Sequence, residues 1–410
     1  MFVRTITTIS ELDNLVSLTP GERRGMEEVC ETFPFRVNDY YLSLIDWTDD
    51  RDPLRRIVIP DPRELEGGGS LDPSSERKFT KIPGLQHKYR QTGLLLLSDV
   101  CGGICRFCFR KRLFVNRERE TVVDVSEGID YIRAHPEITN VLLTGGDPFS
   151  LDTRRLETVL KELFEIEHVG IVRIGTKMLA YNPYRFLDDP SLPEALSRFR
   201  TPGKRIYVMA HYDHPGEITG PSVQAVDLLQ QSGAVVVDQT PVLNEVNSDP
   251  GVFTGLFRTL SFAGIAPYYV FQCRPSLGNR SFQTPVEHSF RIVQQAWARC
   301  SGLAKRARFV MSHATGKIEV IGKTATHVFM RYHQAADPAD VGRTLVYRSS
   351  PLARWFDEYL HQPDHAGDLC SPGARNMRQP NSPVFSRFCR KAGPCRPDLS
   401  GGPGQATCRR

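Results

Sequence analysis

The chain has 410 residues and a formal net charge of +5, with 40% hydrophobic and 24% charged residues. This length allows a sizeable core without metal or disulfide staples, and the composition excludes global disorder. No apolar run approaches the roughly 20 residues of a membrane span. Met1–Leu18 lacks the basic start and apolar stretch of a secretory signal, so we expect a cytoplasmic protein. The slight positive excess does not indicate nucleic-acid binding.

Residues 1–92 form the first region, which is polar and has helix-like stretches at Gly21–Thr32 and Asn38–Trp47. Turn and proline signals follow at Asp50–Pro62, and Glu66–Ser75 has the composition of a loop. We therefore predict a helical N-terminal extension.

Residues 93–322 form the second region, in which short apolar runs alternate with amphipathic stretches. The runs predicted as strands are Leu94–Ser98, Val141–Thr144, Gly170–Gly175, Arg205–Ala210, Ala234–Asp238, Pro267–Gln272 and Phe309–Ser312. The predicted helices are Val125–His135, Thr153–Phe164, Pro190–Phe199, Ser222–Ser232, Gly251–Phe262 and Val286–Cys300. Continuous apolar runs indicate parallel strands buried on both faces. Repeated strand–helix units indicate an α/β barrel or a doubly wound sheet, and at least six units without a G-x-G-x-x-G loop after the first strand favour a barrel or part-barrel. In such folds the chemistry lies at the C-terminal ends of the strands.

Residues 323–361 form a C-terminal extension, with strand-like Ala325–Arg331 and Leu345–Tyr347 and a helix near Leu352–Leu360. Residues 362–410 are rich in Pro, Gly, Ser, Arg and Cys, so we predict a disordered tail. Four of the cysteines lie in this tail, where their spacing matches no compact zinc motif.

Cysteine is the informative residue type, because the chain has 10 cysteines and we expect a reducing compartment. Cys101, Cys105 and Cys108 form a C-x3-C-x2-C motif in the loop directly after the first predicted strand. Three thiolates on one loop suit a zinc site or a cubane iron–sulfur cluster, and the alternative is three buried thiols. A three-cysteine cubane leaves one iron open, and Gly102 and Gly103 allow the loop to wrap a bulky cluster.

With these residues in place, the chain resembles the radical S-adenosylmethionine (SAM) enzymes and, within them, the lysine 2,3-aminomutase family. The resemblance spans roughly residues 40–350 and rests on the order and spacing of several segments. They are Tyr41–Asp46, Asp52–Pro60, Cys101–Arg112, Leu142–Asp147, Ile171–Lys177, Ala210–Thr219, Pro267–Leu277 and Thr284-Pro285. It implies an α/β fold of the partial TIM-type (β/α)6 barrel class, as in radical SAM enzymes, and an isomerase that moves an amino group between neighbouring carbons.

The resemblance also implies the chemistry of the cysteine loop. Cys101, Cys105 and Cys108 would hold a [4Fe-4S] cluster whose fourth iron binds SAM. One electron from the cluster would split SAM into methionine and a 5′-deoxyadenosyl radical, which abstracts a substrate hydrogen. The electron would come from a donor such as a flavodoxin or ferredoxin.

Two further segments are implied to bind SAM. Gly145, Gly146 and Asp147 follow the second predicted strand and correspond to the family segment that contacts the SAM amino group. An isolated Gly-Gly-Asp is more often an ordinary turn. Gln239, at the end of the fifth predicted strand, is implied to lie near SAM.

The resemblance assigns two more residues to substrate and cofactor. Arg110 is implied to pair with the carboxylate of a small amino acid substrate, for which a planar guanidinium is suited. Lys317 is implied to join pyridoxal phosphate (PLP) as a Schiff base, although most lysines are surface residues. PLP would let the substrate nitrogen migrate, because its imine can accept a neighbouring radical.

The chain departs from the family pattern at three places. The turn before Lys317 is shorter and poorer in glycine, and Thr92 stands where an arginine is expected. Arg274 and Ser312 stand at the two acidic positions that hold the distal ammonium of lysine. Because a cation at 274 would repel a second ammonium, we expect Arg274 to bind a substrate whose distal end is acidic or neutral, so not free lysine.

The leading hypothesis is a radical SAM, PLP-dependent amino acid 2,3-aminomutase, with a homo-oligomer left open. The alternatives are a family member without PLP, or one that acts on a protein lysine. A hypothesis from another class is a zinc-binding nucleic-acid module that uses the cysteine loop and the Arg-containing tail. Metal and sulfide analysis separates these classes.

Overall fold

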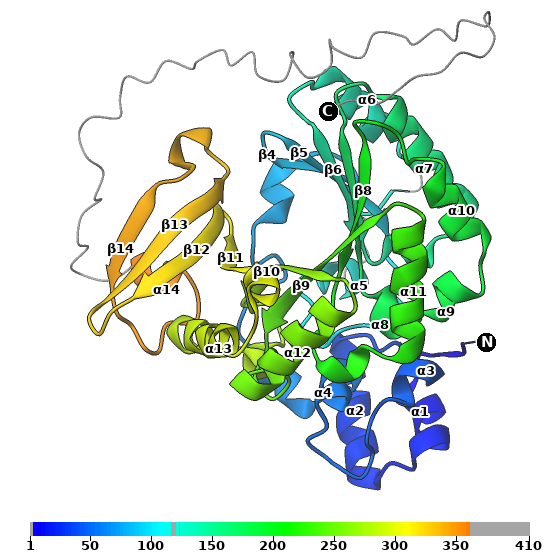
Figure 1. Ribbon diagram of the computed structural model, residues 1–410. Coiled ribbons are helices and arrows are strands. Elements are labelled where there is room, and N and C mark those ends of the chain that lie inside the picture. Colours follow the sequence, from blue (N-terminus) through cyan, green and yellow to red (C-terminus); the bar gives the residue numbers. More distant parts are fainter. Residues whose placement is uncertain (1–2, 116–119, 123, 361–410) are drawn as a thin grey trace, which may run out of the picture. The chain divides into compact units, whose positions relative to one another are not determined.

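The computed structural model describes residues 3–115, 120–122 and 124–360 (Figure 1). These residues belong to one compact unit, Met1–Leu369. The predicted tail, residues 362–410, lies outside the described residues. None of the helices in the described part of the chain has the length and apolar character of a membrane span.

The N-terminal extension consists mainly of short helices whose starts are fixed by capping side chains. Its helices are α1 (Ile9–Val16), α2 (Pro20–Thr32), α3 (Asp39–Leu42) and α4 (Pro53–Val58), and β1 (Thr5–Ile6) pairs with β2 (Val37–Asn38). Thr8 and Thr19 form capping boxes with glutamates three residues later. The predicted helix Asn38–Trp47 is too long, because Ser43 bonds the carbonyl of Tyr40 where α3 ends.

A 12-stranded sheet forms the centre of the unit, in the order β14-β13-β12-β11-β10-β9-β8-β7-β6-β5-β4-β3. Its parallel strands are β5 (Thr92–Ser98), β6 (Asn140–Gly145), β7 (Ile171–Thr176), β8 (Arg205–Ala210), β9 (Val235–Val242), β10 (Ala266–Gln272) and β11 (Arg308–His313). Each overlaps one of the predicted runs. Because the order does not close on itself in the described chain, the sheet is an open part-barrel, as predicted.

Helices connect successive parallel strands and cover the outer face of the sheet (Figure 1). The long ones are α6 (Ser126–Ala134), α7 (Thr153–Glu165), α10 (Ser191–Ser197), α11 (Gly220–Gln231), α12 (Pro250–Phe262) and α13 (Val286–Ala298), and the short ones are α5 (Arg112–Val115), α8 (Met178–Tyr181) and α9 (Tyr184–Leu187). Alternate strand residues such as Leu95, Leu143 and Val172 pack against these helices in one core. Their neighbours face the opposite side of the sheet.

Antiparallel strands extend the sheet at both edges. β3 (Thr80–Ile82) and β4 (Leu85–Tyr89) precede β5, and β12 (Gly316–Lys323), β13 (His327–Ala335) and β14 (Thr344–Arg348) follow β11. The sequence prediction omitted β3, β4 and β12. It extended the last helix too far, because α14 covers only Asp357–Leu360. The three omitted strands, β3, β4 and β12, are partly exposed, so they lack the continuous apolar runs that mark the parallel strands.

The N-terminal extension covers the C-terminal ends of the parallel strands. Tyr41 and Ile57 of the extension share a core with Phe107, Tyr181 and Phe282, which follow β5, β7 and β10. The extension is therefore a wall of the space where part-barrels carry their chemistry.

Candidate active site

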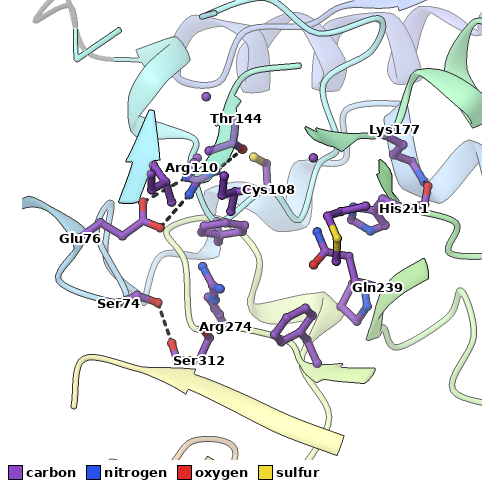
Figure 2. Close-up of a pocket in the computed structure, with 18 of the residues that line it drawn as sticks. Ser74, Glu76, Cys108, Arg110, Thr144, Lys177, His211, Gln239, Arg274 and Ser312 are labelled. Atoms are coloured by element: carbon purple, nitrogen blue, oxygen red, sulfur yellow. Dashed lines mark hydrogen bonds and ion pairs between the residues drawn. The ribbon is translucent and has the colours of Figure 1, made fainter. Parts of the chain in front are cut away.

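A cavity of about 300 Å³ lies on the inner side of the sheet, at the C-terminal ends of the parallel strands. Every residue that the sequence assigns to the site lines it: Cys101, Cys105, Cys108, Arg110, Gly145, Gly146, Asp147, Gln239, Arg274 and Lys317. Figure 2 shows side chains that converge on this space from both halves of the sheet. The fold thus gathers residues that lie far apart in the sequence.

The loop that carries the three cysteines is held by the N-terminal extension. The backbone N–H of Arg106 donates to the carbonyl of Ile57 at 2.8 Å. The Arg106 guanidinium is fully buried and pairs with both oxygens of Glu64, at 2.7 and 3.0 Å. Lys111 reaches the same carboxylate at 3.1 Å. One buried carboxylate therefore compensates two cations of the loop and fixes its path.

The thiols of Cys101, Cys105 and Cys108 line the cavity, and burial raises the pKa of each. A single zinc ion needs ligands about 2.3 Å from one centre. The described residues contain no group of three His, Cys, Asp or Glu side chains placed to hold one ion. A cubane spreads its thiolates over separate irons, and three cysteines on one loop suit that arrangement. At Gly102 a Cβ would lie 2.6 Å from Met178 Sδ, so a larger residue there would require the methionine side chain to move.

Gly145 and Gly146 are required by the packing of one backbone against another. Gly145 has φ of 123°, and a Cβ there would lie 2.3 Å from the carbonyl oxygen of Ser98. A Cβ on Gly146 would lie 2.4 Å from the carbonyl oxygen of Val100. The two glycines therefore allow the end of β6 to pack closely against the backbone that precedes the cysteine loop.

Asp147 is buried, and its carboxylate accepts several internal hydrogen bonds. Oδ2 accepts from Thr176 Oγ1 at 2.8 Å and from the backbone N–H groups of Lys177 and Met178 at 2.7 and 3.2 Å. Oδ1 accepts from the N–H of Phe149 at 3.0 Å. Burial raises the pKa of Asp147 to about 6. The carboxylate thus ties the loop after β6 to the loop after β7, and its direct contact with SAM stays a prediction.

Gln239 lies on β9 beside a network of charged groups that the sequence did not predict. Lys177 Nζ bonds Asp213 and Glu217, each at 2.7 Å, and His211 Nε2 lies 2.9 Å from Asp213. Gln239, His211 and Lys177 all line the cavity, and Figure 2 shows them on the same side of it. The ammonium of Lys177 is therefore fully paired, and the role of Gln239 toward SAM stays a prediction.

Arg110 is held in the cavity by a glutamate that the sequence did not single out. Its Nε and NH2 groups donate to the two oxygens of Glu76, each at 3.1 Å, and NH1 donates to Thr144 Oγ1 at 2.7 Å (Figure 2). Arg112 donates to the same carboxylate at 2.8 Å. Burial disfavours the charge of Glu76, but Arg110 and Arg112 outweigh it and hold its pKa below the usual range. Two of the five N–H groups of Arg110 stay available to a ligand.

Arg274 lies over the ring of Phe109, with its guanidinium carbon 3.6 Å from the ring centre. Its NH1 atom is buried and has no hydrogen-bond partner among the described residues. Burial lowers the pKa of Arg274 to about 10, and Glu76 opposes that shift. Arg274 is therefore still charged near neutral pH, and an acceptor is missing from its surroundings.

Lys317 lies on β12, with Nζ 4.4 Å from the ring centre of Tyr269 and 5.9 Å from that of Tyr89. Burial lowers the pKa of Lys317 well below its usual value, and the cations of Arg173, Arg274 and Lys88 lower it further. A lower pKa makes the amine easier to deprotonate, and the deprotonated nitrogen is the nucleophile that forms a Schiff base.

Lys88 and Arg173 are site residues that the sequence analysis missed. Both line the cavity near Lys317, and burial lowers the pKa of Lys88 to about 8. Lys88 lies on β4, which was not predicted. Arg173 lies between the buried Val172 and Ile174 on β7, and this alternation is a signal that places it on the inner face of the sheet.

Comparison with known proteins identifies relatives of this chain. No family model matches the chain. A relative from Aquifex aeolicus (strain VF5), named "Putative L-lysine 2,3-aminomutase", is 54% identical over 352 residues, which are 86% of this chain and 94% of that protein. The chain belongs to the lysine 2,3-aminomutase family.

Other aminomutases in the comparison are more distant. The L-lysine 2,3-aminomutase of Clostridium subterminale is 34% identical, over 72% of this chain and 71% of that protein. The glutamate 2,3-aminomutase of Clostridioides difficile (strain 630) is 33% identical, over 73% of this chain and 70% of that protein. A solved radical SAM methyltransferase from Sphaerobacter thermophilus aligns with 55% of this chain and 68% of that chain, at 18% identity and a TM-score of 0.38.

Proposed function

We propose that this member of the lysine 2,3-aminomutase family is a radical SAM amino acid 2,3-aminomutase that uses PLP. The observation that carries the proposal is the shared cavity, which the cysteine loop, Lys317 and two arginines line together. When bound, the [4Fe-4S] cluster and SAM would supply a radical that removes a substrate hydrogen, and PLP would supply the group that carries the migrating nitrogen. An open cubane needs a low-potential electron donor, so we infer a flavodoxin or ferredoxin and a cytoplasmic setting.

The residues around Lys317 fit PLP. Lys317 offers a desolvated amine, and the rings of Tyr89 and Tyr269 lie beside it. Lys88 and Arg173 supply positive charge close to that amine, which suits a phosphate group. In this proposal Lys317 would hold PLP through its aldehyde group, and Lys88 and Arg173 would hold its phosphate.

Arg110 is the proposed ligand of the substrate α-carboxylate. Glu76 takes the N–H of Nε and one N–H of NH2, and Thr144 takes one N–H of NH1, so one N–H remains on each of NH1 and NH2. A carboxylate can accept both at once, in the two-fold geometry that is typical of Arg–carboxylate pairs. Glu76 therefore acts as a positioning residue for Arg110.

Arg274 is the proposed ligand of the distal end of the substrate. Its buried NH1 has no partner in the described chain, and cations outnumber carboxylates in the cavity lining. A distal ammonium would meet repulsion here, whereas a carboxylate would satisfy the unpaired donor. We therefore propose an amino acid with an acidic side chain, and not free lysine, as the substrate.

Metal analysis tests the assignment of the cluster. The anaerobically reconstituted protein should be brown and contain about four irons and four sulfides per chain. Cys101→Ala should lose them, and Cys300→Ala, which removes a buried thiol of a different core, should keep them. A colourless protein that contains zinc would reject the radical SAM assignment.

Substrate comparison tests the assignment of Arg274. The reconstituted enzyme, supplied with SAM, PLP and a chemical reductant, should convert glutamate or aspartate and leave lysine unchanged. Arg274→Gln should lower kcat/KM about tenfold to a hundredfold, the value of a hydrogen bond to a charged group. Arg258→Gln, at an exposed position, is the control. Efficient formation of β-lysine would reject the acidic substrate.

A further inference from the structure

Tyr181 places its hydroxyl on one of the three loop thiols. The phenol oxygen lies 2.9 Å from Cys105 Sγ, and the tyrosine is almost fully buried, with 1% of its surface exposed. Tyr181 is the last residue of α8, which follows β7, whereas Cys105 follows β5. The contact therefore joins two different strand–helix units of the part-barrel.

The position of the Tyr181 ring is fixed from several sides. Asn38 Nδ2 donates to the carbonyl of Tyr181 at 2.8 Å, which holds its backbone. The ring of Tyr41 meets the ring of Tyr181 edge-on at 4.8 Å. A Cβ on Gly103 would lie 3.2 Å from two atoms of the ring, so the missing side chain at Gly103 lets the ring lie flat against the loop. The hydroxyl is thus aimed at Cys105 before any cluster binds.

This hydrogen bond distinguishes Cys105 from the other two loop cysteines. Among the three loop thiols in the described structure, Cys105 is the one that forms a hydrogen bond with a side-chain hydroxyl. A thiolate bound to iron can only accept a hydrogen bond, so the phenol must be the donor once a cluster is present. Hydrogen bonds to the sulfur ligands are among the features that set the reduction potential of iron–sulfur clusters.

We propose that Tyr181 is a positioning residue that raises the reduction potential of the cluster through its hydrogen bond to Cys105, an inference that rests on the proposed radical SAM function. The cluster accepts one electron from an external donor, and no proton moves. The added negative charge strengthens the O–H···S bond, so the bond favours the reduced state. Without the bond the cluster is harder to reduce, and the step that starts the reaction is slower.

Redox titration of the reconstituted protein without SAM tests this role. The ratio of reduced to oxidised cluster is read by electron paramagnetic resonance at fixed applied potentials. Tyr181→Phe should lower the ratio about tenfold at each potential, which is a shift of about 59 mV for one electron. Tyr212→Phe is the matched control, because it removes a buried tyrosine hydroxyl that bonds Ser222 instead. It should leave the ratio unchanged.

A second variant tests whether the change seen in Tyr181→Phe comes only from a local folding defect. Gly103→Ala pushes the Tyr181 ring back by a few tenths of an ångström and should lower the ratio in the same direction, by less. A fully loaded Tyr181→Phe cluster with the wild-type ratio would overturn the inference. So would loss of iron from Tyr181→Phe, because the hydroxyl would then hold the cluster without tuning it. Failure of the wild type to form a cubane would instead reject the proposed function.

Discussion

Glu76 holds Arg110 by one edge of its guanidinium, with two oxygen–nitrogen distances of 3.1 Å. The carboxylate also pairs with Arg112, which has Glu120 as a second partner. Arg110 also donates from NH1 to Thr144 Oγ1, so one N–H group of NH1 and one of NH2 have no partner among these contacts. Glu76, which comes from the N-terminal extension, is therefore part of the lining of the cavity and belongs to the proposed substrate site.

Replacement of Glu76 by Gln should raise KM more than it lowers kcat. The amide cannot accept from both Nε and NH2 of Arg110, so the guanidinium loses its fixed direction. We expect a rise in KM of about tenfold, measured by steady-state kinetics with the reconstituted enzyme. A fall in KM would show that Glu76 competes with the substrate for Arg110.

Lys317 should account for the visible absorbance of bound PLP. The band should vanish on borohydride treatment of the wild type and be absent from Lys317→Ala, because no other residue is assigned to the aldehyde. Lys323→Ala, at the far end of β12, should keep the band. A reducible band that persists in Lys317→Ala would remove Lys317 from this role and leave the chain without an assigned PLP lysine.

Glu64→Gln should destabilise the fold and weaken iron binding. The substitution leaves Arg106 and Lys111 buried without their shared carboxylate, for which a cost of about 3–5 kcal/mol is expected. Glu27→Gln removes an exposed pair with Arg23 and should cost less than about 1 kcal/mol. Urea unfolding of the two variants and their iron content check this prediction, which fails if the two lose similar stability.

Asp147 should impose a pH dependence on stability. Its pKa is about 6 in the folded state, against an ordinary value of 3.8, so the folded state binds a proton that the unfolded state has released. The free energy of unfolding should therefore fall as the pH rises from about 4 to about 6. Compared with Asp147→Asn, the wild type should lose up to about 3 kcal/mol across this range. A difference that stays constant with pH would contradict the assignment.

The sequence predicted the parallel part of the fold and the cysteine loop for clear physical reasons. Strands buried on both faces give continuous apolar runs, and three cysteines on one loop are close in space because they are close along the chain. Half-exposed strands such as β4 and β12 give no such run. The inner-face residues Lys88 and Lys317 lie on these two strands, so Lys88 was missed and Lys317 was found only through the family resemblance.

Contacts between distant segments limited the rest of the prediction. The oxygens of Asp147 accept hydrogen bonds from Thr176 and Lys177, 29 and 30 residues away, which the sequence did not reveal, and its contact with SAM stays a prediction. Glu76 and Tyr181 belong to segments whose letters carry no special pattern. Their roles depend on which loop lies beside them, and that is decided only when the sheet and the N-terminal extension pack together.

The hydrogen bonds that hold the cysteine loop have a consequence for the order in which the protein folds and takes up iron. The loop is bonded to Ile57 and Glu64 on one side, and Asn279 Nδ2 donates to the carbonyl of Phe107 at 3.3 Å on the other. Its shape therefore exists only after more than two hundred residues of chain have come together. Iron should enter as a late event of maturation, and residues 93–322 expressed alone should not serve as a minimal catalytic fragment.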